Sequence, residues 1–404
     1  MSPKKEYRNE EDLHVALGMV LKSVNMRMKG VDHNIIYVVS DPGAGKTMMG
    51  RDIVTKNGGF LKAYSPALER LEKFGGIPDI IKVKNSEEEE ELHTKWSVPQ
   101  MITEINELAS KHPYVVVMLD DWHLCIDELQ QIGFELFTYY SLNGYKVKSN
   151  VTFMLAGNET SAAGAKLQLS PIRNRCTLIY AKPNVDYWIN NYAQPNNIHP
   201  SAVSFFKDKS NQQYFQEPES TSEQFGSPRS WASASNWLKE IETDKNYSDG
   251  DKTRLLYSIL FGSVSPKAAE KFMQHYEIFR NIDLEKIFKH GDVTIPTDNI
   301  ERFCFCSAVN SKFFNLFYIA NEKKDINRKI EFSKIYKQCL LGMKDKYPEL
   351  AVMMGKDLGK MGSSKWSGGL TGKTILTFLF QKEILTTDEF SWLIEVGNVA
   401  REDG

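Results

Sequence analysis

The stretch that decides the fold reads Asn34-Ile-Ile-Tyr-Val-Val-Ser-Asp-Pro-Gly-Ala-Gly-Lys-Thr-Met-Met-Gly50. A short apolar run rich in β-branched residues comes first, a turn with two glycines follows, and a helical pattern comes last. This order predicts a buried strand, a loop and a helix. Ser40 to Thr47 match the phosphate-binding loop pattern, with serine where the first glycine is usual. The segment therefore predicts a nucleotide site.

The chemistry of phosphate binding gives most residues of this loop a role. Successive backbone N–H groups wrap the phosphates, and the N-terminal end of the next helix faces them. We expect Lys46 to reach the β- and γ-phosphates of ATP, and the Thr47 hydroxyl to ligate the Mg²⁺ ion that bridges them. The predicted nucleotide-binding residues are Ser40, Asp41, Pro42, Gly43, Ala44, Gly45, Lys46, Thr47 and Met48.

A second octet, Ser367 to Thr374, has the same skeleton. The residues before it, Lys356 to Trp366, do not form an apolar run. Because a phosphate-binding loop follows a buried strand, we interpret this octet as a chance match.

Two further apolar runs, Tyr114 to Asp121 and Val151 to Asn158, predict strands buried on both faces of a parallel sheet. At the end of the first, Asp120 is predicted to bind Mg²⁺, and Asp121 to act on the attacking water. Aspartate is shorter than the glutamate that is usual in the second position, so an alternative in which Asp121 only caps the next helix stays open. The amide of Asn158 is predicted to orient water between these carboxylates and the γ-phosphate.

Three arginines follow. Arg173 and Arg175 lie where a guanidinium could stabilise the γ-phosphate of a neighbouring subunit, although either could be a surface ion-pair residue. Arg229, in Phe225-Gly-Ser-Pro-Arg-Ser-Trp231, begins a predicted helix and could reach back to the same nucleotide.

In this order and spacing, these motifs resemble the AAA+ ATPases, and specifically their MoxR-like branch, over residues 10–290. The resemblance implies that Asn158 is sensor 1, that Arg175 is the finger acting in trans with Arg173 beside it, and that Arg229 is sensor 2. The segment 139–150 looks like the hairpin before sensor 1. Phe74 and the glycines after it are either a loop that faces the pore of a ring or a plain turn.

The alternation of apolar runs with helical patterns predicts an α/β domain at 1–190, and helical spacing predicts a mostly helical second half. Residues 294–404 lie outside the family pattern and are expected to form a mostly helical region of unknown role. The resemblance implies a three-layer α/β/α core with a parallel sheet in the first part and a helical lid at 191–293. It also implies a homo-oligomer, a hexamer or another closed ring, because the finger acts on the next subunit's site. The implied activity is ATP-driven remodelling of a macromolecule.

Composition narrows the remaining choices. Lys and Arg total 50 against 52 Asp and Glu, so the net charge of -2 does not attract the chain to nucleic acid or anionic membranes. The predicted substrate is therefore protein in preference to DNA or RNA. A nucleic-acid motor, or a nucleotide-gated scaffold with little turnover, stays open as an alternative.

The sequence also predicts the location of the protein. Its five cysteines show no disulfide pattern, its start does not resemble a signal peptide, and no apolar run approaches 18 residues. These features predict a cytoplasmic protein without a membrane span. The composition is rich in Lys and Asn, and the motif pattern resembles phage-encoded members of the family. Together they suggest a phage gene, in which case the location is the host cytoplasm.

Overall fold

The chain forms two compact units, Met1–Asn184 and Val185–Gly404. The computed structural model describes residues 10–84, 90–158, 170–217, 223–362, 367–386 and 391. The division of the second unit into a lid and a C-terminal region at 293/294 stays a prediction.

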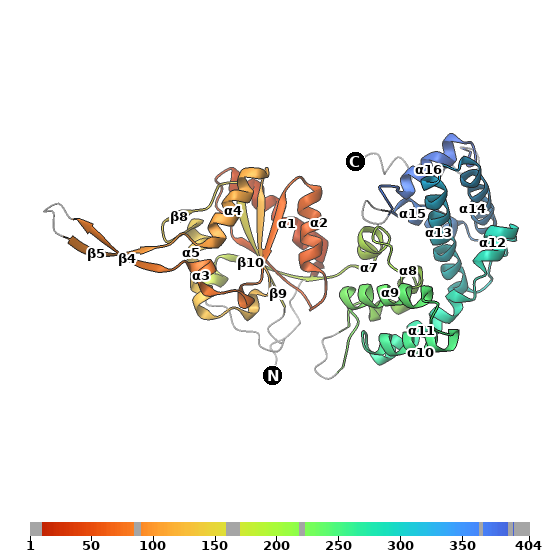
Figure 1. Ribbon diagram of the computed structural model, residues 1–404, viewed down its shortest axis with the longest axis horizontal. Coiled ribbons are helices and arrows are strands. Elements are labelled where there is room, and N and C mark those ends of the chain that lie inside the picture. Colours follow the sequence, from red (N-terminus) through yellow and green to blue (C-terminus); the bar gives the residue numbers. More distant parts are fainter. Residues whose placement is uncertain are drawn as a thin grey trace. The chain divides into compact units, whose positions relative to one another are not determined.

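The first unit is built on a six-stranded sheet in the order β1-β10-β2-β9-β6-β3, in which all neighbours are parallel (Figure 1). Its strands are β1 (Glu10–Asp12), β2 (Ile35–Val39), β3 (Phe60–Tyr64), β6 (Val115–Leu119), β9 (Val151–Gly157) and β10 (Cys176–Lys182). Strands β2, β6 and β9 are buried along their whole length. The edge strand β1 was not predicted, because its charged sequence Glu-Glu-Asp contains no apolar run.

Helices cover both faces of this sheet. They are α1 (Leu13–Met28), α2 (Lys46–Lys56), α3 (Leu71–Gly75), α4 (Gln100–Lys111), α5 (Asp127–Tyr139) and α6 (Ser170–Arg173), with short 3-10 turns η2 (Pro66–Leu68) and η3 (Trp122–Leu124). Alternate residues of each strand point to opposite faces. Val38 therefore packs in the same core as α1 and α2, and Val39 in the core that holds α3, α4 and α5. The predicted three-layer α/β fold is confirmed.

Two antiparallel hairpins extend the unit. Strands β4 (Pro78–Lys84) and β5 (Glu90–Trp96) form a ribbon that projects away from the sheet (Figure 1). Strands β7 (Ser141–Leu142) and β8 (Tyr145–Lys146) form the short hairpin expected at 139–150. Its turn residues Asn143 and Gly144 both have positive φ, as a tight two-residue turn requires.

Phe74 does not face a pore from an exposed loop. Its side chain is 3% exposed and makes an edge-on contact with the ring of Tyr64. The glycine after α3, Gly76, has φ 75° and leaves no room for a Cβ, which would lie 2.5 Å from Ser97 O. Of the two interpretations of this segment, the structure supports the turn.

The described part of the second unit is helical. Its elements are α7 (Val185–Trp188), the π-helical turn η4 (Ile189–Ala193), α8 (Pro200–Lys207), η5 (Lys209–Tyr214), α9 (Pro228–Thr243), α10 (Asp249–Phe261), α11 (Pro266–Arg280), α12 (Leu284–His290), α13 (Asn299–Glu322), α14 (Ile326–Lys346), α15 (Pro348–Gly359) and α16 (Gly372–Gln381). One hydrophobic core runs from Trp188 to Tyr276 and a second from Ile287 to Leu385. Within the ranges that the structure describes, no helix is long and apolar enough to cross a membrane.

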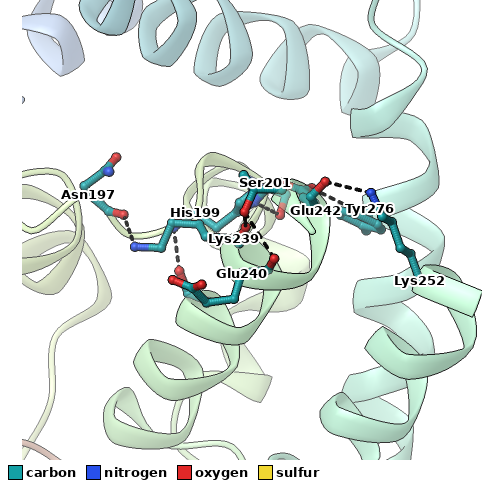
Figure 2. A network of polar contacts seen from close by, with 10 residues as sticks. Asn197, His199, Ser201, Lys239, Glu240, Glu242, Lys252 and Tyr276 are labelled. Atoms are coloured by element: carbon teal, nitrogen blue, oxygen red, sulfur yellow. Dashed lines mark hydrogen bonds and ion pairs between the residues drawn. The ribbon is translucent and has the colours of Figure 1, made fainter. Parts of the chain in front are cut away.

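A polar network ties the helices around the first of these cores together (Figure 2). His199, which caps α8, lies 2.9 Å from Glu242 Oε2 through its Nε2 atom. Tyr276 of α11 donates to Glu242 Oε1 at 2.6 Å, and Lys252 of α10 donates to the Glu242 backbone oxygen at 2.9 Å. Glu242 therefore joins α8, α9, α10 and α11.

The buried His275 predicts a pH-dependent stability. Its Nε2 atom lies 2.7 Å from Ser204 Oγ, and burial lowers its pKa to about 4, although the charge of Asp208 acts in the opposite direction. Because the folded state then binds fewer protons than the unfolded state, this stabilisation is complete above the unfolded pKa near 6.5 and is lost as the pH falls toward 4. We expect a loss of up to about 3 kcal/mol across this interval.

Chemical denaturation between pH 4 and pH 7.5 measures this effect. His275→Gln keeps a polar atom near Ser204, and the free energy of unfolding should depend less steeply on pH in this variant. His290→Gln, at an exposed position, is the control and should keep the wild-type slope. Equal slopes for wild type and His275→Gln would contradict the prediction.

Candidate functional site

The predicted phosphate-loop residues, Asp120, Asp121 and Asn158 lie at the carboxyl ends of three neighbouring strands. Arg173 and Arg175 lie instead just before the amino end of β10. Strand β9 lies between β2 and β6, so Asn158, directly after β9, lies between Ser40 and Asp120. The backbone is tied across this edge, because Ser40 N donates to Gly157 O at 3.1 Å. Asp120 N likewise donates to Tyr64 O of β3 at 2.7 Å. Segments far apart in sequence therefore meet here.

The loop between β2 and α2 has the backbone that phosphate binding needs. Gly43 and Gly45 have φ of 74° and 93°, a left-handed conformation that favours glycine. A Cβ at Gly45 would have no atom within 4 Å, so within the chain itself the backbone conformation, not lack of space, requires glycine. Gly45 is the residue before α2, whose first N–H groups have no partner within the helix.

Lys46 lies at the centre of the site and is 7% exposed. Its ammonium donates to Asn158 Oδ1 at 2.7 Å, to Ser40 O at 3.2 Å and to Ser40 Oγ at 3.3 Å. A fourth acceptor, Asp41 O, lies at 3.4 Å. Serine in place of the usual first glycine thus adds one acceptor for the lysine.

The two predicted metal ligands are in direct contact. The Thr47 hydroxyl donates to Asp120 Oδ2, and Asp120 Oδ1 accepts from the backbone N–H of Asp121 at 3.0 Å. A hydroxyl and a carboxylate are the hard oxygen ligands that Mg²⁺ prefers, so these residues fit the ion.

Asp121 adopts a left-handed conformation with φ 53°. It precedes η3, but its side chain makes no cap hydrogen bond there. The alternative in which Asp121 only caps the next helix therefore lacks the side-chain hydrogen bond that it requires.

His123 is a site residue that the sequence pattern does not indicate. It is 4% exposed, and its Nδ1 atom accepts from the backbone N–H of Asn158 at 3.2 Å. Burial lowers its pKa, Lys46 lowers it further, and the carboxylates of Asp121 and Asp120 oppose this. The sequence signal that could have indicated it is its position in Asp120-Asp121-Trp122-His123, two residues after the aspartate pair.

The remaining loop residues surround this centre. Ala44 is buried, Asp41, Pro42 and Thr47 are half-buried, and Met48 is 57% exposed on the first turn of α2. Their contacts with a nucleotide stay predictions.

The arginines lie in different settings. Arg175 is half-buried, donates from Nε to Thr138 Oγ1 at 2.6 Å, and stacks on Phe134 with its guanidinium carbon 4.1 Å from the ring centre. Arg173, at the end of α6, is exposed. Arg229 is exposed on the first turn of α9 in the second unit, where Ser227 and Ser230 form a capping box. Its contact with the nucleotide stays a prediction.

The second octet has a different setting from the first. Residues 367–371 form a turn that leads into α16, and the element before them in the described chain is the helix α15. A Cβ at Gly372 would lie 1.6 Å from Leu358 O, so this glycine serves the close packing of α16 against α15. Lys365, in the segment Lys356 to Trp366 that precedes the octet, lies outside the described residues.

Comparison with known proteins gives structural neighbours only. No protein family and no curated protein matches the sequence. A point mutant of Thermotoga maritima RuvB is 12% identical, with 70% of this chain and 82% of that chain aligned and a TM-score of 0.34. The RuvB Holliday junction branch migration motor of the same organism is 13% identical, with 70% and 78% aligned and a TM-score of 0.33. NtrX from Brucella abortus is 12% identical, with 79% and 67% aligned and a TM-score of 0.32.

Likenesses this remote do not decide family or activity, so the functional assignment rests on the residues of the site.

Proposed function

We propose that this protein is an AAA+ ATPase of the MoxR-like branch, which hydrolyses ATP to ADP and phosphate in a closed homo-oligomeric ring, a hexamer by the family pattern. The observation that carries the proposal is the convergence of Lys46, Thr47, Asp120 and Asn158 at one edge of the parallel sheet. An ammonium, a hydroxyl, a carboxylate and an amide are the groups that phosphoryl transfer to water requires.

Each group has a task in this reaction. The Lys46 ammonium binds the β- and γ-phosphates, and in doing so exchanges its acceptors on Ser40 and Asn158 for phosphate oxygens. The Asn158 amide, once separated from Lys46, is available to orient the attacking water. Asp121 accepts the proton of that water, and its position beside Asp120 is held by the 3.0 Å hydrogen bond between the two residues.

Thr47 and Asp120 would hold Mg²⁺. When bound, the ion neutralises the charge that develops on the phosphate oxygens. The protein contributes a hydroxyl and a carboxylate that already touch each other, so little rearrangement is needed to bring both to one ion.

The arginine settings favour Arg173 over Arg175 as the residue that acts on the next subunit. Arg175 already donates to Thr138 and stacks on Phe134 of its own subunit, and both contacts would be lost if it extended outward. Arg173 lies two residues earlier and is exposed. The resemblance alone had favoured Arg175.

The net charge of the chain supports one class of substrate. A net charge of -2 gives no general attraction to the phosphate backbone of DNA or RNA, which supports a protein complex as the remodelled macromolecule. We further infer a cytoplasmic location, the host's if the gene is viral.

ATP turnover tests the proposal. Purified protein should release phosphate from ATP with Mg²⁺ and stop when EDTA removes the ion. Turnover should stay within about twofold when DNA or RNA is added. Strong stimulation by polynucleotide that disappears with rising salt would indicate the nucleic-acid motor instead. Nucleotide binding without turnover would indicate the scaffold.

A further inference from the structure

His123 is held in place by the turn that follows the two aspartates. Trp122, in the same 3-10 turn, is 2% exposed and packs against Phe137 at 5.6 Å between ring centres. A Cβ at Gly133 would lie 2.7 Å from the Trp122 ring, so α5 offers a glycine where the indole enters the core. Trp122 thus anchors η3, and the left-handed Asp121 turns the chain so that His123 faces the end of β9.

The contact of His123 fixes the backbone at Asn158. The last residue pair between β2 and β9 joins Val39 and Gly157, so the N–H of Asn158 lies just beyond the regular ladder. His123 Nδ1 accepts this N–H, which places the ring proton on Nε2. Without this acceptor, the N–H in this part-buried position would be left without a hydrogen bond, which destabilises the local conformation. His123 therefore determines where the chain leaves the strand.

The orientation of the Asn158 side chain depends on that backbone. Its Oδ1 atom lies 2.7 Å from Lys46 Nζ, so a shift of the backbone would move the amide away from the reacting groups. His123 thus links the segment that carries Asp120 and Asp121 to the residue that orients water.

We propose that His123 is a positioning residue for ATP hydrolysis: its Nδ1 atom holds Asn158 in register with Asp120 and Asp121. This inference rests on the proposed ATPase function. It implies that His123 contributes to turnover and little to nucleotide affinity, because its hydrogen bond goes to the backbone of Asn158 and not to the phosphate-binding loop.

Three variants of the full-length protein test this role. In His123→Asn the amide oxygen lies the same number of bonds from Cβ as Nδ1, so an acceptor is retained. His123→Gln moves the same amide outward by one methylene, and His123→Leu removes it. The steady-state kcat and KM for Mg-ATP are measured beside the melting temperature. We expect His123→Asn to keep kcat within about threefold, and the other two variants to lose about tenfold or more in kcat with KM nearly unchanged.

The comparison of Asn with Gln decides the proposal even if His123→Leu does not fold. Wild-type turnover in His123→Gln would overturn it, and so would equal losses in the Asn and Gln variants, since packing alone would then explain the effect. A loss confined to KM would also overturn it. If the wild type itself hydrolyses no ATP, the proposed function is wrong, whereas failure of the positioning role leaves wild-type turnover intact.

Discussion

Replacing Lys46 with alanine lowers ATP turnover by about 10²-fold or more, the largest effect expected from any single substitution in the phosphate-binding loop. The Lys46 ammonium donates to Asn158, Ser40 and Asp41 at the centre of the site. The substitution removes the cation that binds the β- and γ-phosphates. Phosphate release from Mg-ATP measures turnover, and fluorescent nucleotide titration measures binding.

The chain contains a matched control for this substitution. Lys373 has the same Gly-Lys-Thr context, but it lies on an exposed face at the start of α16, after a turn and not after a strand. Lys373→Ala should leave turnover within about twofold of wild type. If Lys46→Ala hydrolysed ATP at the wild-type rate, the assignment of the site to Ser40–Thr47 would be wrong. A collapse of turnover in Lys373→Ala would instead assign a role to the second octet.

The second large effect concerns Arg173. Removal of an arginine that acts in trans on the γ-phosphate should lower turnover by about 10³-fold or more while nucleotide binding survives. In Arg173→Ala the site of each subunit is complete except for the guanidinium of its neighbour. The rate of phosphate release and the nucleotide affinity, measured on the assembled oligomer, separate these two properties.

Mixed rings test whether the arginine acts across the interface. Arg173→Ala and Lys46→Ala are each inactive alone, but a Lys46→Ala subunit still supplies Arg173 to an intact site next to it. Random coassembly of equal amounts should therefore restore about a quarter of the wild-type rate. No recovery would show that Arg173 acts within its own subunit or has no role in the reaction.

Arg175→Ala is the control in this experiment. Its loss removes the bond to Thr138 and the stacking on Phe134, so we expect a lower melting temperature of the first unit. If mixtures of Lys46→Ala with Arg175→Ala recover turnover, and mixtures of Lys46→Ala with Arg173→Ala do not, Arg175 is the residue that acts in trans.

Much of the site could be predicted from the sequence because its chemistry allows few residue types. Positive φ at Gly43 and Gly45 favours glycine, and the contact of Thr47 with Asp120 joins the two kinds of oxygen that Mg²⁺ prefers. The apolar runs before Asp120 and Asn158 are long enough to mark buried parallel strands, and parallel strands end at a common edge. Each of these local patterns has a physical cause in the residues that form it.

The role of His123 and the choice between Arg173 and Arg175 could not be predicted in this way. The acceptor for Asn158 is 35 residues earlier in the chain, and nothing near His123 in the sequence indicates that its ring reaches β9. Arg175 lies in the turn before β10, and its partner Thr138 lies 37 residues earlier, in α5, so the choice between Arg173 and Arg175 likewise depends on a distant contact. Phe74 is buried because it meets Tyr64, which no turn pattern reveals.

By itself, the sequence determined the strand, loop and helix around Ser40–Thr47, the buried strands that carry Asp120 and Asn158, and the helical character of the second half. These depend on backbone conformation and hydrophobic periodicity, which are properties of neighbouring residues. Only the tertiary structure decided that β9 lies between β2 and β6, that His123 holds Asn158, and that Arg175 is engaged within its own subunit. Strand order and side-chain partners are set by packing between distant segments, and local sequence does not encode that packing in a readable pattern.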